Sequence, residues 1–413
     1  MQDNDINDVS RRDFLQTGAA VAGVSGLALG GATPATAADD PKPESKKTLP
    51  TRPLGKTGVD VTILNQGTWQ ASGLDRILRF AYDQGIRYFD TAKSYGSEPG
   101  IKKWLQAMPE VRKNIFLVTK DSPHTPKQLI PMLDQRLAAL GVDHVDLIFC
   151  HAMGDHNEPI DWPKSKEFKE TIETIKKSGK AKFVGFSTHH ARRAEYLQAA
   201  ADGGFVDVIM LQYTPWLDKD APLNRALDAC WKKGIGLVSM KQVAGQFGEA
   251  TKGGPLDEVF KKAPMLKEKG LTPYQALLHA IWTDERISTS CVSMRNTDQI
   301  RSNVDAARRF EPLKQAELHQ LHEAVLAAGP TLCADCDGRC AVAAGTKARL
   351  GDLTRYLTYH EYHGDKHEAR QNYAALTEAE RDWRGADLAA AREACPSGLD
   401  FARLLPKADD LLS

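Results

Sequence analysis

Four polar residues of different chemistry lie at the ends of three consecutive apolar runs. Asp90 stands in "YFDTA" with Tyr95 just after it in "KSYG", Lys120 ends "FLVTK", and His151 ends "LIFCH". A phenol is a weak acid with a pKa of about 10, but an adjacent ammonium stabilises the phenolate, and a carboxylate keeps that ammonium charged. With an imidazole to orient a carbonyl oxygen, the set suits a general acid that protonates this oxygen as hydride reaches the carbon.

A second group of reactive side chains is the cysteine-rich segment "CADCDGRC". Cys333, Cys336 and Cys340 are followed much later by Cys395, which directly precedes Pro396. Three close cysteines with a remote Cys-Pro follow the ligand pattern of bacterial ferredoxins, although the second spacing here is C-x3-C rather than C-x2-C. Four thiolates would also suit zinc, and export would permit a disulfide. We predict one [4Fe–4S] cluster held by the four cysteines, with zinc as the alternative.

These residues need a scaffold that brings distant segments together, and the order of elements supplies one. Eight short apolar runs, continuous rather than alternating, are typical of parallel strands buried on both faces. They begin at Val61, Ile86, Ile115, Val145, Ala181, Val206, Gly234 and Ser288. With helical patterns between them, they predict an α/β fold, a (β/α)8 TIM barrel of ~250 residues. A doubly wound sheet is the alternative, but no run is followed by G-x-G-x-x-G.

A TIM barrel carries its chemistry at the C-terminal ends of its strands, so the fold explains why the four polar residues converge. Taken singly, Asp90 could cap a helix, Lys120 could be a surface charge and His151 could be a satisfied core group. Their shared position at the strand ends favours the catalytic interpretation.

Composition and boundaries divide the chain into parts. The barrel is predicted over 51–325, followed by a small, mainly helical C-terminal domain over 326–413, in which 352–376 and 377–395 have helical patterns. Apolar residues make up 42% and charged residues 26%, which is ordinary for a soluble globular protein. The 54 basic residues balance the 54 acidic ones, so composition gives no reason to expect a nucleic-acid partner or a charged membrane surface.

The first 38 residues are predicted to be an export signal, and 39–50 a charged linker. Arg11 and Arg12 precede a Gly/Ala-rich apolar run too short to span a bilayer, which ends at an A-x-A site, Ala35–Ala37. The pattern resembles a twin-arginine signal; a disordered basic tail is the alternative. We therefore expect a periplasmic or otherwise exported protein that uses the twin-arginine machinery. No membrane anchor is expected, because no cysteine follows the apolar run to carry a lipid.

Six motifs in order resemble the aldo/keto reductase family across residues 52 to about 310. They are "RPLGKTG", "FDTAKSYG", "LVTK", "IFCH", "GFS" and "LQY". The resemblance implies Tyr95 as proton donor, Lys120 and Asp90 as the pair that tunes it, and His151 as the residue that orients the substrate. It implies an NAD(P)-dependent oxidoreductase that reduces an aldehyde, ketone or sugar, or oxidises the corresponding alcohol. The alternative from another class is a non-catalytic nicotinamide-binding module that senses redox state while its tail docks a partner.

The resemblance also indicates where the nicotinamide would lie, although several positions differ. Ser187 and Gln212 match residues that hold the nicotinamide in the family, whereas Thr188 replaces the usual asparagine. Where the family commonly stacks a tyrosine after the seventh strand, this chain has Met240 and Lys241. We expect all but Thr188 to contact the cofactor.

The other end of the cofactor is expected after the eighth strand. The Lys-Ser pair and the later arginine that grip a 2′-phosphate in the family are replaced here by Ser293-Met294 and Gln299, while Arg295 and Asn303 remain. An arginine can clamp a phosphate through two parallel hydrogen bonds. Arg295 therefore favours NADP, with NAD as the alternative.

The tail also resembles the ferredoxin-like extension of some aldo/keto reductases, which commonly carry two clusters. The cysteines of a second set are missing here. The remaining cluster would have either a structural role or an electron-transfer partner.

Two further groups of residues are less well determined by the sequence. Trp69 is predicted to line the substrate pocket and Trp216 is a weaker candidate, since either could be a packing residue. His360, His363 and His367 would share one face of a continuous helix. Both metal binding and an ordinary surface or packing role stay open for these histidines.

Overall fold

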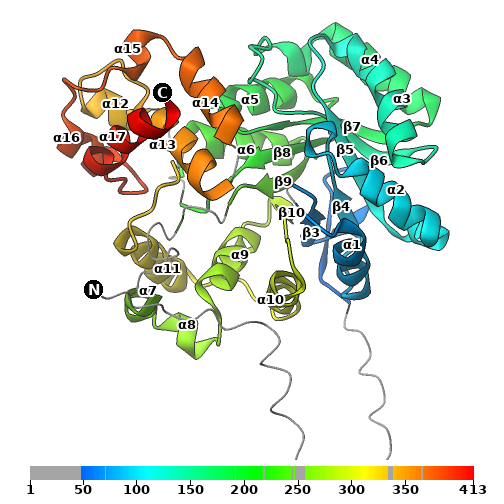
Figure 1. Cartoon of the computed structure of the whole chain (residues 1–413), viewed down its shortest axis with the longest axis horizontal. Coiled ribbons are helices and arrows are strands. Elements are labelled where there is room, and N and C mark those ends of the chain that lie inside the picture. The colour runs from blue at the N-terminus through cyan, green and yellow to red at the C-terminus, as the bar shows by residue number, and fades with distance from the viewer. Residues whose placement is uncertain are drawn as a thin grey trace, which may run out of the picture. The chain divides into compact units, whose positions relative to one another are not determined.

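Eight parallel strands close into a barrel in the computed structural model, in the order β10-β3-β4-β5-β6-β7-β8-β9 (Figure 1). They are β3 (Leu64–Gly67), β4 (Tyr88–Asp90), β5 (Phe116–Asp121), β6 (Val145–Cys150), β7 (Ala181–Thr188), β8 (Val208–Gln212), β9 (Gly236–Met240) and β10 (Ile287–Val292). Every residue of β5 and β6 is buried, as expected for strands covered on both faces. The predicted TIM barrel is confirmed.

The structure describes residues 48–413 with the exception of 70, 191, 217–218, 243–245, 247–255, 334–337 and 364–365. The predicted export signal, 1–38, and almost all of the predicted linker, 39–50, lie outside the described residues. Both therefore stay predictions.

Helices cover the outside of the barrel and follow the strands in the predicted alternation (Figure 1). They are α1 (Leu74–Asp83), α2 (Glu98–Ala107), α3 (Leu129–Leu140), α4 (Lys166–Ser178), α5 (Arg193–Gly203), α6 (Pro222–Lys232), α7 (Leu256–Lys262), α8 (Met265–Glu268), α9 (Pro273–Thr283), α10 (Thr297–Arg308) and α11 (Gln315–Ala327). The Thr272 side chain caps α9 by accepting a hydrogen bond from the Gln275 backbone N–H at 3.2 Å. In β7, a Cβ on Gly185 would lie 1.8 Å from the Val208 carbonyl oxygen, so only glycine fits there.

The first predicted strand is divided between two elements. Val61 belongs to β2 (Asp60–Thr62), which pairs antiparallel with β1 (Thr51–Pro53) outside the barrel, whereas the barrel strand β3 begins at Leu64. The continuous apolar run concealed this break, because the hairpin and the strand both bury apolar side chains. Strand pairing decides where one element ends and the next begins.

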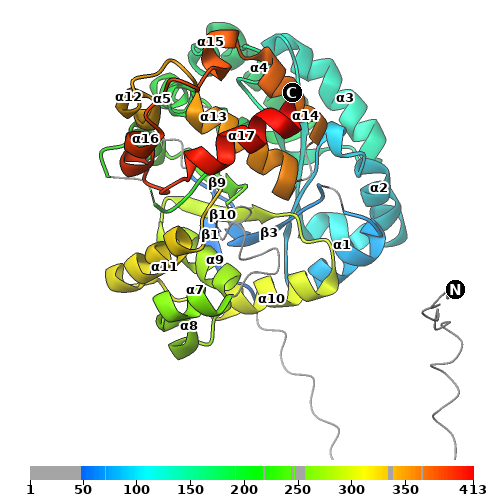
Figure 2. The same cartoon turned by 60° about the vertical axis from the view of Figure 1, so that its left-hand side comes forward.

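The C-terminal region is helical, as predicted, with a hydrophobic cluster of its own. Its elements are α12 (Arg339–Ala343), α13 (Leu350–Thr358), a π-helical turn η7 (Tyr359–His363), α14 (Lys366–Ala375), α15 (Glu378–Arg381), α16 (Leu388–Ala394) and α17 (Phe401–Leu412). Figures 1 and 2 show α12 to α17 gathered into one group. Residues 46–413 nevertheless form one compact unit, so the boundary at 325 stays a prediction.

One predicted helix of this region is wrong in extent. The pattern over 377–395 indicated a single helix, but the structure has two short ones, α15 and α16. Asp387 ends the intervening segment by capping α16, since its carboxylate accepts hydrogen bonds from the backbone N–H groups of Ala389 and Ala390. The Trp383 indole donates to Asp409 Oδ2 at 3.2 Å and holds the segment against α17.

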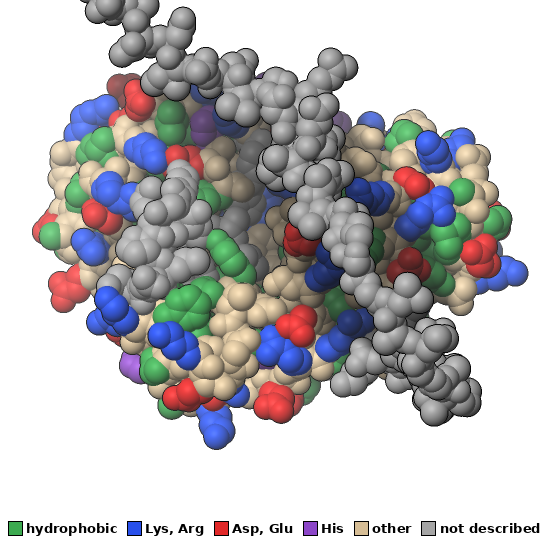
Figure 3. Space-filling model, turned by 60° about the horizontal axis from the view of Figure 1, so that its bottom comes forward, with side chains coloured by type: hydrophobic (Ala, Val, Ile, Leu, Met, Phe, Trp, Pro, Cys, Tyr) green, Lys and Arg blue, Asp and Glu red, His purple; other side chains and the backbone are tan. Residues whose placement is uncertain are grey.

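The surface is mixed in charge, in keeping with the zero net charge. Figure 3 shows acidic and basic side chains interspersed over the described part of the face drawn there. Among the residues that the structure describes, no helix combines the length and the apolarity needed to cross a membrane.

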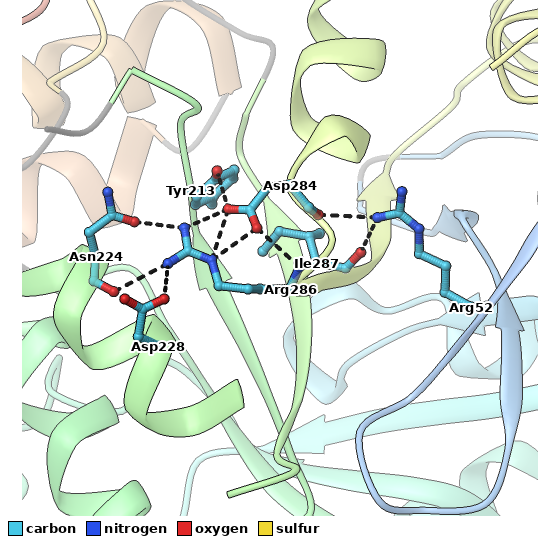
Figure 4. A network of polar contacts seen from close by, with 7 residues as sticks. All are labelled: Arg52, Tyr213, Asn224, Asp228, Asp284, Arg286 and Ile287. Carbon is cyan, nitrogen blue, oxygen red and sulfur yellow. Dashed lines mark hydrogen bonds and ion pairs between the residues drawn. The ribbon is translucent and has the colours of Figure 1, made fainter. Parts of the chain in front are cut away.

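A polar network ties the hairpin and α6 to the start of β10 (Figure 4). The Arg52 guanidinium donates to the backbone oxygens of Asp284 and Ile287 at 3.1 and 2.8 Å. The Asp284 carboxylate accepts from Arg286 and from the Tyr213 hydroxyl, at 2.6 and 2.7 Å. Arg286 also contacts Asn224 and Asp228 of α6. Charged and polar groups thus hold together the hairpin, the end of β8, α6 and the start of β10.

Candidate active site

The barrel brings Asp90 and Lys120 together as a buried ion pair. Asp90 ends β4 and Lys120 lies near the end of β5, and the two residues are 1% and 0% exposed. The Lys120 ammonium contacts Asp90 Oδ1 and donates a second hydrogen bond to the Thr91 carbonyl oxygen at 2.9 Å. The Asp90 carboxylate and the Thr91 carbonyl oxygen together fix the position of the lysine ammonium.

Tyr95 and His151 complete the predicted set at the same place. Tyr95 ends the short 3-10 helix η2 (Lys93–Tyr95), and its ring centroid lies 5.0 Å from Lys120 Nζ. The rings of Tyr95 and His151 meet edge-on, with centroids 5.6 Å apart. The ring of Trp69 also meets Tyr95 edge-on, with ring centroids 4.9 Å apart. Tyr95 and His151 are both partly exposed, so a ligand in the barrel mouth could reach them.

The environment controls the protonation of this group. Burial lowers the pKa of His151 well below its ordinary value, and the positive charges of Lys120 and Lys241 lower it further. Burial raises the pKa of the Asp90 carboxyl, while the adjoining Lys120 ammonium opposes that rise. The imidazole is therefore neutral at neutral pH and can take part in a hydrogen bond without adding another positive charge.

A chain of buried hydroxyl groups positions the loop that carries Tyr95. Thr68 Oγ1 and Thr91 Oγ1 lie 2.8 and 2.6 Å from Ser97 Oγ. Thr68 also donates to the Asp90 carbonyl oxygen at 3.0 Å. The tyrosine loop is thereby fastened to the ends of the first two barrel strands.

A second buried network supports the strand that carries Lys120. The Glu98 carboxylate accepts hydrogen bonds from Thr119 at 2.8 Å and from Arg136 at 2.6 Å. Arg136 also forms an ion pair with Asp121 at 3.2 Å. Because Thr119 and Asp121 flank Lys120 in β5, the network restrains the strand end on both sides of the lysine.

Sequence reasoning missed one residue of this site. It assigned Cys291 to the core, as it did Cys150 and Cys230, but the Cys291 thiol faces the Asp90 carboxylate from β10. Burial raises the pKa of this thiol well above its ordinary value, and the charge of Asp90 raises it further. The thiol therefore stays protonated. Its position at the C-terminal end of a barrel strand was the signal that could have identified it.

At the end of β7, the predicted nicotinamide contact Ser187 and its neighbour Thr188 are buried and tied to the neighbouring loop. The Ser187 hydroxyl accepts a hydrogen bond from the Ala152 backbone N–H at 3.0 Å. Thr188, at the position of the usual asparagine, donates to the Met153 carbonyl oxygen at 2.8 Å. The threonine hydroxyl thus joins the end of β7 to the loop after β6 through this hydrogen bond.

At the end of β8, the predicted nicotinamide contact Gln212 is met by the C-terminal region. The Tyr359 hydroxyl donates to Gln212 Oε1 at 2.9 Å, and Gln212 Nε2 donates to the Cys333 carbonyl oxygen at 3.3 Å. Lys241 Nζ lies 4.0 Å from the centroid of the same tyrosine ring. The tail thus brings a tyrosine to the end of β9, where the resemblance implied one and the chain has Met240. No sequence signal indicated this contact.

The predicted phosphate contacts gather at the start of α10. Asn296 caps this helix by accepting a hydrogen bond from the Gln299 N–H at 2.9 Å, and Gln299 Oε1 accepts one from the Arg295 N–H at 2.7 Å. The side chain of Arg295 is exposed, and Ser293 and Asn303 are partly buried nearby along the chain. A helix N-terminus with an exposed arginine suits an anion.

Three of the four predicted cluster ligands line one cavity of about 570 Å³. They are Cys333, Cys340 and Cys395, whereas Cys336 lies outside the described residues. Burial raises the pKa of Cys333 to about 11 and that of Cys340 to about 12. The cavity is also lined by Arg192, Lys347 and Arg349, and two of these pair with acidic residues of the same lining, Arg192 with Glu195 and Arg349 with Asp352.

The structure also bears on the predictions for Trp216 and for the tail histidines. Trp216 stacks on His322, with ring centroids 4.8 Å apart, inside a hydrophobic cluster with α9 and α11, so it is a packing residue. The three tail histidines do not lie on one continuous α-helix, because the π-helical turn intervenes. His360 is buried and His367 is exposed, while the His363 side chain lies outside the described residues.

Comparison with known proteins identifies the family to which this chain belongs. The model of the aldo/keto reductase family matches residues 64–325, so the chain belongs to that family. It is 24% identical to L-glyceraldehyde 3-phosphate reductase of Escherichia coli O157:H7, over 67% of this chain and 94% of the relative. It is 27% identical to L-galactose dehydrogenase of Arabidopsis thaliana, over 63% of this chain and 89% of the relative.

Two further matches agree with these. D/L-glyceraldehyde reductase of Hypocrea jecorina is 32% identical, over 54% of this chain and 73% of the relative. The crystal structure of a protein assigned as 2,5-diketo-D-gluconic acid reductase B matches 68% of this chain and 92% of its own, with a TM-score of 0.53 and 22% identity. The latter likeness supports the fold.

Proposed function

We propose that the chain is an exported, NAD(P)-dependent oxidoreductase that reduces the carbonyl group of an aldehyde, ketone or sugar, or oxidises the corresponding alcohol. The observation that carries the proposal is the convergence of Tyr95 and His151 on the buried Lys120–Asp90 pair at the barrel mouth. Relatives named for glyceraldehyde and L-galactose favour a small polyhydroxylated substrate.

Each of the four residues has a role that follows from its position. Tyr95 donates its phenolic proton to the carbonyl oxygen, and the Lys120 ammonium stabilises the phenolate that remains. Asp90 keeps the ammonium oriented, and the neutral imidazole of His151 hydrogen-bonds the substrate oxygen. A bound nicotinamide supplies or accepts the hydride. Trp69, packed against Tyr95, provides an apolar wall for the substrate.

The residues present fit a nicotinamide nucleotide with a 2′-phosphate. Ser187 and Gln212 lie at adjacent strand ends of the barrel, and Arg295 is exposed at the N-terminus of α10, which favours NADP over NAD. Tyr359 contacts Gln212 from the tail, so a nucleotide bound beneath it would be retained. We infer that the nucleotide is bound before export, since free nicotinamide cofactor is not expected outside the cytoplasm.

The cavity lined by the cysteines supports the further proposal of one [4Fe–4S] cluster held by Cys333, Cys336, Cys340 and Cys395. Thiols gathered in one cavity are the donor set that iron–sulfur clusters and zinc share. A cluster must be assembled inside the cell, which agrees with export of the folded protein by the twin-arginine route. Its role is structural or in single-electron transfer to a partner.

Purified full-length protein tests the proposal directly. Denaturation should release about one NADP(H) per chain, and the intact protein should reduce a panel of small hydroxyaldehydes. Retained nucleotide without turnover on any carbonyl or alcohol would instead favour a non-catalytic redox-sensing module. Export is tested separately, by cell fractionation of Arg11→Lys/Arg12→Lys, which should stay in the cytoplasm.

A further inference from the structure

Outside the catalytic set, one imidazole and two carboxylates converge beside the barrel mouth. Asp155 lies in the loop after β6, His189 directly follows β7, and Glu368 belongs to α14. One ligand atom from each lies within 4.8 Å of the other two. We propose that Asp155, His189 and Glu368 bind a divalent first-row metal ion, with zinc as the best match, which joins the C-terminal helices to the barrel.

The distances suit ligands arranged around a common ion. His189 Nε2 lies 3.6 Å from Asp155 Oδ2 and 3.6 Å from Glu368 Oε1. Both distances are too long for a good N–H···O hydrogen bond. Two ligands each about 2.0–2.1 Å from a tetrahedral zinc ion stand about 3.4 Å apart, close to the observed spacing.

The imidazole is buried and aimed at the two carboxylates. The side chain of His189 is 8% exposed and forms no hydrogen bond with another described residue. The ring of Tyr359 meets it edge-on at 5.5 Å and restricts its orientation. The imidazole nitrogen that faces the two carboxylates is placed to act as a ligand, and a metal ion between the three groups would engage all of them.

The two barrel ligands are held in place by their own loops. Thr188, next to His189, is hydrogen-bonded to the loop after β6. In that loop the Gly154 N–H, next to Asp155, donates to the buried Glu158 carboxylate at 2.8 Å. A Cβ on Gly154 would lie 2.6 Å from His190 Cγ, so glycine allows the two loops to approach this closely. Asp155 and His189 therefore face each other before any ion binds.

Glu368 differs from the other two ligands in being accessible from solvent. Its side chain is 40% exposed, which gives an ion a path of entry and leaves room for a water molecule as fourth ligand. Imidazole and carboxylate donors together suit zinc better than magnesium or calcium, which prefer oxygen alone. Since Glu368 comes from the tail, the ion would clamp α14 over the loops after β6 and β7.

The alternative is that cationic side chains alone neutralise the two carboxylates. Burial and the charge of Glu368 raise the pKa of Asp155 to about 8, and the nearby charges of Lys241 and Arg355 oppose that rise. The two explanations differ in whether the metal ion itself binds. They also differ in whether the ion protects α14 from opening.

Metal titration of full-length protein, after dialysis against a chelator, tests the proposal. Calorimetry should detect zinc binding. Cobalt bound at the same site should give weak visible absorption bands without thiolate charge transfer, whereas cobalt bound by the cysteines would show that charge transfer. Glu368→Gln and His189→Ala should each lower the affinity for zinc. The loss should be at least as large as the roughly 10–100-fold loss caused by removing a residue that only supports a metal ligand. His367→Gln, an exposed imidazole next to Glu368, is the matched control and should bind zinc as the wild type does.

Hydrogen exchange of 366–375 gives a second readout. Zinc should slow the exchange of these amides in the wild type and in His367→Gln. In Glu368→Gln, zinc should leave their exchange rate unchanged. Because the Glu368 side chain is 40% exposed, Glu368→Gln should fold as the wild type does, so a fold defect in His189→Ala would not obscure the result. The proposal is overturned if zinc does not bind outside the cysteines, or if Glu368→Gln binds it as tightly as the wild type.

Discussion

The hydroxyl of Tyr359 donates a 2.9 Å hydrogen bond to Gln212 Oε1, across 147 positions of sequence. Both residues are fully buried, and the other end of the glutamine amide donates to the Cys333 carbonyl oxygen. One side chain at the barrel mouth therefore contacts both the π-helical turn and the first cysteine of the tail. The barrel and the predicted cluster region are coupled through this glutamine.

Replacing Tyr359 by phenylalanine should loosen the tail over the barrel mouth. The buried Gln212 Oε1 loses its hydrogen bond from the phenol, which costs about 1–3 kcal/mol for an unsatisfied buried acceptor. Faster hydrogen exchange over 350–375 and faster loss of bound nucleotide are the expected results. Tyr356→Phe, one turn earlier in α13, is the control; equal effects of both variants would contradict the role of the Gln212 contact.

Tyr95→Phe should retain cofactor binding and lose most carbonyl reduction, roughly 10²–10⁴-fold, because the proton donor is removed while the ring stays. Turnover of a reactive test aldehyde and nucleotide binding are to be measured on the same preparation. Wild-type turnover in this variant would show that the assigned mechanism is wrong.

Lys120→Met should destabilise the barrel by about 3–5 kcal/mol, because it leaves the Asp90 carboxylate buried without its cation. The double variant Asp90→Asn/Lys120→Met should recover part of that loss, since the uncompensated charge is gone. Urea unfolding measures both. A double variant less stable than Lys120→Met would argue against this account of the pair.

The network around Asp284 should contribute to stability in a pH-dependent manner. Burial opposes ionisation of Asp284, but hydrogen bonds and charge from Arg286 hold its pKa below the ordinary value. Its contribution is therefore fully present above the unfolded-state pKa of about 4, and is lost as the pH falls from there through the lower folded-state pKa.

The free energy of unfolding should accordingly differ most between wild type and Asp284→Asn above about pH 4, and the difference should shrink below that pH. Asp228→Asn, the half-exposed partner of the same arginine, should have a small effect throughout. A difference between wild type and Asp284→Asn that stays constant from pH 6 to pH 3 would refute the assignment.

Cys395→Ser should abolish cluster binding and destabilise the whole tail, because metal binding and folding are coupled. Iron and sulfide analysis with electron paramagnetic resonance on anaerobically purified protein is the measurement. Cys230→Ser in α6, whose thiol donates to the Leu197 carbonyl oxygen, should keep its iron. If the wild-type protein contains stoichiometric zinc and no iron, the cysteines bind zinc and the cluster assignment is wrong.

The sequence by itself determined the barrel and predicted that four polar residues, Asp90, Tyr95, Lys120 and His151, would meet at its mouth. Continuous apolar runs separated by helices specify buried parallel strands, and parallel strands of a closed barrel must end at one rim. Polar residues at consecutive strand ends, such as Lys120 and His151, are therefore neighbours whatever the details of packing. The four cysteines were likewise proposed from spacing, and three of them line one cavity in the structure.

Tertiary structure decided the contacts between segments that no local pattern links. The meeting of Tyr359 with Gln212, of Cys291 with Asp90 and of Glu368 with His189 depends on how the tail and β10 pack against the barrel. Periodicity and spacing report only the state of a residue's own segment. Which side chains from distant segments become neighbours is set by burial of the apolar faces of those segments, and that is settled only when the whole chain has folded.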